Sequence, residues 1–149
     1  MKAVEKLLAL GADPDAQNES GETPLLLACY RKDQESFVRL LVNIGADVNL
    51  ADDCGNTPLI VSATDDRLKT VRLLVDRGAD VNAQNVEGDT PLTNASIWGE
   101  RRTVQFLLSR GADPGLVDGL GCSAMDLASQ KGNQTIAAMM RAVMVETAT

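Results

Sequence analysis

The chain has 149 residues, 44% of them hydrophobic, a size that fits one globular domain or a short array of small repeated units. Because its 21 acidic residues outnumber its 14 lysines and arginines, the formal net charge is −7, which argues against electrostatically driven binding to DNA or RNA. The lack of histidine removes the commonest general base and the commonest metal ligand. One Trp, one Tyr and two Phe leave small aliphatic side chains to fill the core.

Neither the N-terminus nor the cysteines indicate export. Glu5 and Lys6 interrupt the apolar run that a signal peptide needs, and no apolar stretch reaches the length of a membrane span. Cys29, Cys54 and Cys122 are odd in number and far apart in the sequence, so a disulfide framework is not expected. We therefore expect a cytoplasmic protein with free thiols.

Two short motifs recur along the whole chain with one period. Gly-Ala-Asp occurs at 11–13, 45–47, 78–80 and 111–113, with spacings of 34, 33 and 33 residues. Thr-Pro-Leu occurs at 23–25, 57–59 and 90–92, and a degraded copy, Ser-Ala-Met, follows at 123–125. Two interleaved motifs that keep one period indicate a repeat protein.

Each period predicts a helix, a turn, a second helix and a hairpin loop. Thr at 23, 57 and 90 is a helix N-cap candidate, and the proline that follows it suits the first helical position. The second helices carry paired apolar residues, namely Leu40-Leu41, Leu73-Leu74, Phe106-Leu107 and Met139-Met140. The Gly of Gly-Ala-Asp then suits a left-handed C-cap, and Asn, Asp and Gly beyond it favour a hairpin turn. The first full copy is one residue longer, which we place in the inter-helix turn at 31–36.

This unit, with its Thr-Pro-Leu and Gly-Ala-Asp, resembles the ankyrin repeat over essentially the whole chain. The resemblance implies a single all-α domain over 1–149, a solenoid of stacked helix-turn-helix units with projecting β-hairpin loops. A half repeat with only the second helix is expected at 1–13, and full repeats at about 14–47, 48–80, 81–113 and 114–149. In the half repeat, Lys6 takes the slot of Leu40 and its counterparts, which predicts an exposed end or a cut from a longer array.

Four positions depart from the family pattern. The family usually carries His after Thr-Pro-Leu, but this chain has Leu26, Ile60, Thr93 and Asp126 there. We expect the two aliphatic residues to pack in place of the usual polar bridges between repeats. Near the C-terminus, Met139, Met140 and Met144 either fill the core or form an adaptable exposed contact.

No constellation in the sequence predicts catalysis. The neighbouring carboxylates Asp52-Asp53 and Asp65-Asp66 fall on expected turns, and no third group converges on them. Gly115, Gly119 and Gly121 belong to a hairpin and do not form a phosphate loop. Cys29 falls where the family carries a small buried Ala, whereas Cys54 and Cys122 are expected to be partly exposed. We therefore expect no catalytic residue, metal or cofactor, and no enzyme.

By resemblance, a partner binds the concave surface built from hairpin tips and first helices. The partner-binding residues assigned to it are Glu19, Glu22, Tyr30, Arg31, Asp53, Asp65, Glu87, Asp89, Ile97 and Trp98. Trp98 is the expected anchor and Tyr30 a secondary contact; the alternative for Trp98 is packing against the next hairpin. The six acidic residues either attract a basic partner segment or form a solvated surface.

The resemblance thus implies a monomeric, non-enzymatic protein–protein interaction module that binds neither nucleic acid nor membrane. Two alternatives remain open: a steric inhibitor or regulator of an enzyme or toxin, and the recognition fragment of a larger protein with an activity elsewhere. The family also suggests Asn49 and Asn82, which follow Gly-Ala-Asp-Val, as candidates for asparaginyl hydroxylation.

Overall fold

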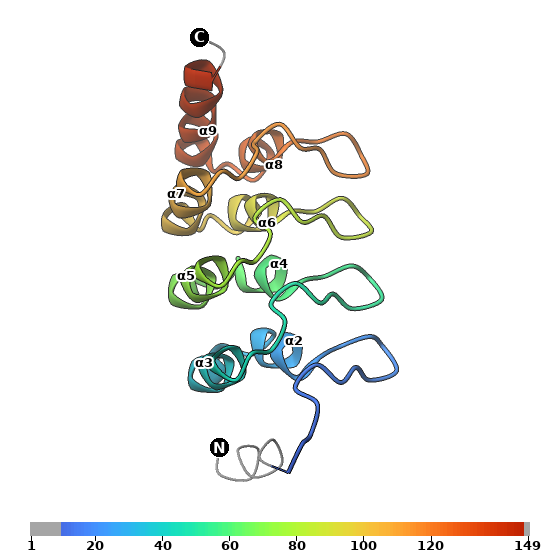
Figure 1. Ribbon diagram of the computed structural model, residues 1–149. Coiled ribbons are helices and arrows are strands. Elements are labelled where there is room, and N and C mark those ends of the chain that lie inside the picture. The colour runs from blue at the N-terminus through green and yellow to red at the C-terminus, as the bar shows by residue number, and fades with distance from the viewer. Residues whose placement is uncertain (1–9, 148–149) are drawn as a thin grey trace.

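A computed structural model describes residues 10–147 and arranges them as a stack of helix pairs (Figure 1). The first helices of the pairs are α2 (Pro24–Cys29), α4 (Pro58–Ser62), α6 (Pro91–Ile97) and α8 (Ala124–Gln130). The second helices are α3 (Glu35–Asn43), α5 (Leu68–Asp76), α7 (Arg101–Ser109) and α9 (Gln134–Thr147). The all-α solenoid predicted from the repeat is therefore confirmed. The expected helix of the half repeat, with Lys6, lies outside the described residues.

Each first helix begins at a side-chain cap. Thr23, Thr57 and Thr90 accept hydrogen bonds from the backbone N–H three residues later, at 3.1, 3.2 and 3.1 Å. These bonds satisfy first-turn amides that have no partner inside the helix. Ser123 does the same at the degraded copy, at 3.2 Å. The predicted caps are confirmed, and the cap survives the change from Thr-Pro-Leu to Ser-Ala-Met.

The four positions where the ankyrin pattern usually has histidine hold two kinds of residue in this chain, aliphatic and polar. Leu26 and Ile60 are buried against the stack, as expected. Thr93 donates its backbone N–H to the Thr90 hydroxyl and accepts from the Thr90 N–H, and Asp126 forms the same capping box with Ser123. Polar residues at this position therefore stabilise their own helix start, a role that our sequence analysis missed.

The core lies between the two layers of helices. Leu25, Leu59 and Leu92 contribute from the first helices, and Leu41, Leu74, Leu107 and Met140 from the second helices; all are buried. Met139 packs against this core, while Met144 is 39% exposed. Core filling is thus correct for Met139 and Met140. Cys29 is buried as expected, Cys54 is exposed and Cys122 is partly exposed.

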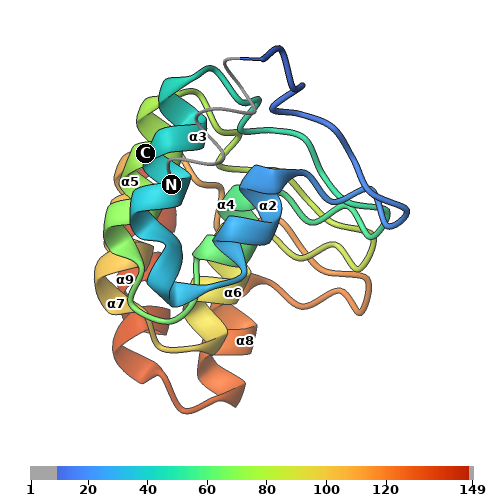
Figure 2. The ribbon, with the colours of Figure 1, turned by 90° about the horizontal axis from the view of Figure 1, so that it is seen from below.

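The loops between helix pairs project to one side of the stack (Figures 1 and 2). Each is closed across its neck by a backbone hydrogen bond such as that from the Asn85 N–H to the Asp89 carbonyl, 3.1 Å. In the described residues this backbone pairing does not extend far enough to form strands. The last loop has one isolated β-bridge, between Val117 and Ser123. The expected β-hairpins are therefore hairpin-shaped turns.

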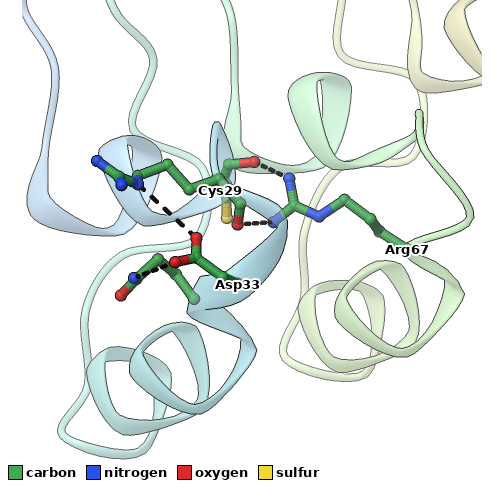
Figure 3. Close-up of polar contacts among 5 residues, drawn as sticks. Cys29, Asp33 and Arg67 are labelled. Atoms are coloured by element: carbon green, nitrogen blue, oxygen red, sulfur yellow. Dashed lines mark hydrogen bonds and ion pairs between the residues drawn. The ribbon is translucent and has the colours of Figure 1, made fainter.

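Neighbouring helix pairs are tied together by side chains that reach backbone groups across the gap. Arg67, in the turn after α4, donates its guanidinium to the carbonyls of Cys29 and Arg31 at the end of α2 (Figure 3). Asn49 donates to the Gly78 carbonyl at 3.1 Å, and Asn82 donates to Gly111 in the same way at 3.2 Å. These bonds supply donors to carbonyls at the helix ends or just beyond them, among them that of Cys29, the last residue of α2.

The turns between the two helices of a pair differ in backbone conformation. The extra residue of the first copy lies in this turn, as expected, where the chain forms a short 3₁₀ helix, η1 (Lys32–Gln34). In the α4–α5 turn, Asp65 and Asp66 both have positive φ, of 61° and 53°. Asp66 stands at the position of Gly99 and Gly132, whose φ values are 77° and 80°. A non-glycine residue is strained in this left-handed region.

We expect Asp66→Gly to raise the free energy of unfolding by about 0.5–1 kcal/mol, because glycine relieves the left-handed strain. Urea denaturation followed by circular dichroism measures the change. Asp66→Ala is the control, since it removes the same carboxylate but keeps a Cβ at positive φ. A gain in stability from the alanine variant as large as that from glycine would assign the effect to charge and contradict the conformational explanation.

Candidate functional site

The loop tips form a continuous row along the stack. The Asp53 N–H donates to the Ser20 carbonyl at 3.1 Å, the Val86 N–H to Cys54 at 2.9 Å, and the Gly119 N–H to Glu87 at 2.7 Å. Two glutamines add to these bonds: Gln84, for example, donates to the Val117 carbonyl of the next loop at 3.1 Å. The backbone of the row is therefore held by its neighbours over its whole length.

The exposed side chains of the row change character along it. Glu19 and Asp53 are exposed on the first two loops. On the last two loops Val86 is 73% exposed and Leu120 is 90% exposed, with Glu87 exposed between them. Val86 and Leu120 are not among the residues assigned to the binding surface from the sequence. The repeat period could have indicated that Val86 is exposed, because it stands at the position that holds Glu19 and Asp53 in the earlier copies.

The first carboxylate of the Asp52-Asp53 pair builds the turn. Its Oδ1 accepts from the backbone N–H groups of Cys54 and Asn56, both at 2.9 Å, and its Oδ2 accepts from the Tyr30 hydroxyl at 3.0 Å. Burial opposes ionisation of Asp52, but these bonds outweigh it and lower the pKa of the carboxyl. Asp52 is thus a structural anion, and Asp53 is the carboxylate that faces solvent.

Two acidic residues assigned to the exposed surface are partly buried. Glu22 accepts a hydrogen bond from the Asn18 side-chain amide at 2.8 Å inside its own loop. Burial, together with the charges of Glu87 and Asp118, raises the pKa of Asp89. Glu22 and Asp89 are therefore less accessible than a fully solvated carboxylate, and their part in partner binding stays a prediction.

Tyr30 and Arg31 lie at the end of α2. The Tyr30 side chain is 48% exposed, and its burial and its bond to Asp52 raise the pKa of the phenol to about 12. It therefore remains a neutral hydrogen-bond donor at physiological pH. Arg31 is exposed, and its Nε lies 3.8 Å from the Asp33 carboxylate (Figure 3), a long ion pair that leaves the guanidinium accessible.

Trp98 lies at the end of α6 with its indole in solvent. It is 65% exposed, so the alternative that it packs against the next hairpin is wrong. Ile97 beside it is partly buried. The Asn133 side chain donates to the carbonyls of Ser96 and Ile97, at 2.8 and 3.2 Å, and so fixes the backbone that carries the indole. A large apolar ring is thus presented from a rigid support.

Asp65 stands at the position of Trp98 in the preceding helix pair, eight residues after the capping Thr. Its carboxylate lies 2.9 Å from the Lys32 ammonium, so the two charges largely cancel at this site. Of the six acidic residues expected from the sequence, Glu19, Asp53 and Glu87 are therefore the ones that are exposed and lie outside an ion pair of the described residues.

Neither the buried thiol nor the acidic side chains of the described residues have the features of a reactive nucleophile or a metal site. Burial raises the pKa of the Cys29 thiol to about 11, which keeps it protonated. Between residues 10 and 147 no three His, Cys, Asp or Glu side chains converge as a metal site would require. The surface instead offers carboxylates, apolar side chains and an indole at fixed spacing.

Two family models match the chain. A model described as ankyrin repeats in three copies matches residues 1–85, and a model described as an ankyrin repeat matches residues 87–119. A search of curated proteins returns no match. In the part of the chain that the structure describes, no helix combines the length and the apolar character needed to cross a bilayer.

Proposed function

Because the chain belongs to the ankyrin-repeat family, whose members are generally protein–protein interaction modules, we propose that it binds a protein partner along its loop tips and first-helix ends. These are the elements that the resemblance assigns to the concave, partner-binding surface. The proposal depends chiefly on the exposure of Trp98. The chain has one tryptophan in 149 residues, and its side chain is 65% exposed and not part of the core. A large exposed apolar group on a rigid support is typical of an interaction anchor.

The row of tips defines the chemistry of the partner. Glu19 and Asp53 favour basic side chains at one end, and Val86 and Leu120 favour apolar side chains at the other. A partner segment that lies along the row therefore carries its basic residues toward the first loops and its apolar residues toward the last. Trp98 and Tyr30 contact the partner at the helix ends, beside this segment.

We expect Trp98→Ala to weaken partner binding at least tenfold, since truncation of a buried interface tryptophan commonly costs about 2 kcal/mol or more. Wild type, Trp98→Ala and Val145→Ala are each used to capture proteins from a lysate of the source cells. Captured proteins are identified by mass spectrometry and then titrated individually. Thermal melting should be nearly unchanged in both variants, because both side chains are largely exposed.

Val145→Ala is the matched control: it truncates a side chain that is 62% exposed, on α9 and away from the loop tips. A partner retained by wild type and by Val145→Ala but lost by Trp98→Ala supports the proposal. Equal affinities for all three proteins contradict the anchor role. A separate measurement tests the acidic loop tips. If they attract the partner electrostatically, its association rate falls as the salt concentration rises from low to physiological, and an unchanged rate argues against such steering.

A further inference from the structure

The second-helix layer carries a groove that the proposed function does not use. A cavity of about 400 Å³ opens between α5 and α7. We call this cavity the arginine groove. Its lining includes three arginines, Arg72, Arg102 and Arg110, together with Leu68, Gln105 and Phe106. A second cavity of about 380 Å³ shares Leu68, Arg72 and Arg102 with it and continues toward α3. The helices concerned lie on the side of the stack opposite the projecting loops (Figure 1).

The groove is positively charged in a protein whose net charge is −7. No carboxylate belongs to the described lining of the arginine groove. Asp76 lies beside it and pairs with Arg110 at 2.9 Å. Within residues 10–147, Arg72 and Arg102 have no ion-pair partner. Glu35, Asp65 and Asp66 line the adjoining cavity, where Asp65 pairs with Lys32. Arg72 and Arg102 thus remain outside any ion pair of the described residues, and ligand carboxylates fit beside them.

The aromatic ring in the groove positions two of the three arginines, Arg72 and Arg110. The guanidinium of Arg72 lies 4.6 Å from the centroid of the Phe106 ring, and that of Arg110 lies 4.7 Å from it. Such stacking leaves the guanidinium edges free to donate hydrogen bonds. Because Arg72 is already positioned, its binding of a carboxylate costs less conformational entropy.

The spacing of the arginines favours a long ligand over a small ion. Arg102 and Arg110 are eight positions apart along α7 and its C-cap, which corresponds to ~12 Å along the helix axis. An extended peptide advances ~3.3 Å per residue, so carboxylates about four residues apart match this distance. Nucleic acid is disfavoured by the charge of the whole chain and because Phe106, with 6% exposure, is covered and offers no stacking surface for a base.

We propose that the arginine groove binds an acidic, extended segment of a protein, whose carboxylates accept paired hydrogen bonds from Arg72 and Arg102 and, at the far end of α7, from Arg110, which also pairs with Asp76. Guanidinium and carboxylate groups match in such bidentate contacts. The groove is then a second binding surface, independent of the loop tips, and the protein can hold a basic segment on one side and an acidic segment on the other.

The test measures fluorescence anisotropy of a labelled Glu-Ser-Gly repeat peptide of about twelve residues, long enough to span the groove. Arg102→Gln should weaken binding roughly tenfold, which corresponds to a loss of about 1.4 kcal/mol of binding free energy. Arg101→Gln is the matched control, because it removes the same charge from the adjacent, exposed position of α7, outside the groove; it should change the affinity less than about twofold. Arg72→Gln provides an independent variant, and thermal melting verifies that each protein folds.

Several results would overturn the proposal. Equal weakening by Arg101→Gln and Arg102→Gln would indicate general electrostatic attraction. Equal binding of a peptide with Gln in place of Glu, or tighter binding of a single-stranded oligonucleotide, would exclude an acidic protein segment. Full displacement of the peptide by low millimolar inorganic phosphate would reduce the groove to a small-anion site. Trp98→Ala should bind the peptide with the affinity of wild type. The groove and the loop tips are therefore tested independently, and either proposal can fail without the other.

Discussion

Replacing Gly88 with alanine is expected to lower the free energy of unfolding by about 3 kcal/mol, for two separate reasons. Gly88 has φ of 83°, a left-handed conformation that costs an L-residue about 1–2 kcal/mol. A Cβ at this position would also lie 2.8 Å from the Asp118 Cα in the adjacent loop. That neighbour is backbone held by its own hydrogen bonds, so it cannot move aside as a flexible side chain could.

Gly121→Ala separates the two contributions. Gly121 occupies the same position in the last loop with φ of 78°, but a Cβ there meets no atom within 4 Å. This variant therefore reports the cost of the left-handed backbone alone, about 1–2 kcal/mol. Urea denaturation of both variants gives the difference. If Gly88→Ala proves no more harmful than Gly121→Ala, the close approach of neighbouring loops does not constrain the stack.

Replacing Arg67 with alanine is expected to cost about 2–3 kcal/mol of stability. Its guanidinium donates to the carbonyls of Cys29 and Arg31, and hydrogen bonds from charged donors are stronger than those between neutral groups. The positive charge also lies at the C-terminal end of α2, where the helix dipole is negative. Truncation would remove this donor from the partly buried Cys29 carbonyl and would weaken the contact between the first two helix pairs.

The control for Arg67 is Arg39→Ala, which removes an exposed arginine whose pair with Glu35 spans 3.7 Å. We expect this change to cost less than about 0.5 kcal/mol, as exposed ion pairs within a helix usually do. Arg67→Lys should give an intermediate loss, because an ammonium cannot match the fork of a guanidinium. A loss for Arg39→Ala as large as that for Arg67→Ala would show that net charge, and not the bridge to α2, sets the stability.

The fold follows from the repeat period because each motif residue acts locally. Thr90 caps the helix that begins beside it, and Gly45, with φ of 96°, ends the helix before it. Such effects need no knowledge of distant contacts. The bridges between helix pairs could not be foreseen in this way: the position of Arg67 holds Glu100 and Asn133 in later copies, and only the Arg and Asn can donate to a carbonyl.

The candidate site was predictable to the extent that exposure depends on position within one repeat. Trp98 and Tyr30 are exposed as expected, and their role in binding stays a prediction. Glu22 and Asp89 are partly buried, which their position within one repeat did not predict. The arginine groove was not foreseen either, because Arg72 and Arg102 come from helices thirty positions apart and their meeting depends on how α5 and α7 pack.

The bridges across the gaps also bear on how the molecule folds. They join residues separated by 29 to 38 positions, as in the bonds of Asn49 to Gly78 and Arg67 to Cys29, so each connects a helix pair to its immediate neighbour. The longest loop that folding must close is therefore set by the length of one unit and not by the length of the chain. A stack of this kind can grow by further units without slowing the search for any single contact.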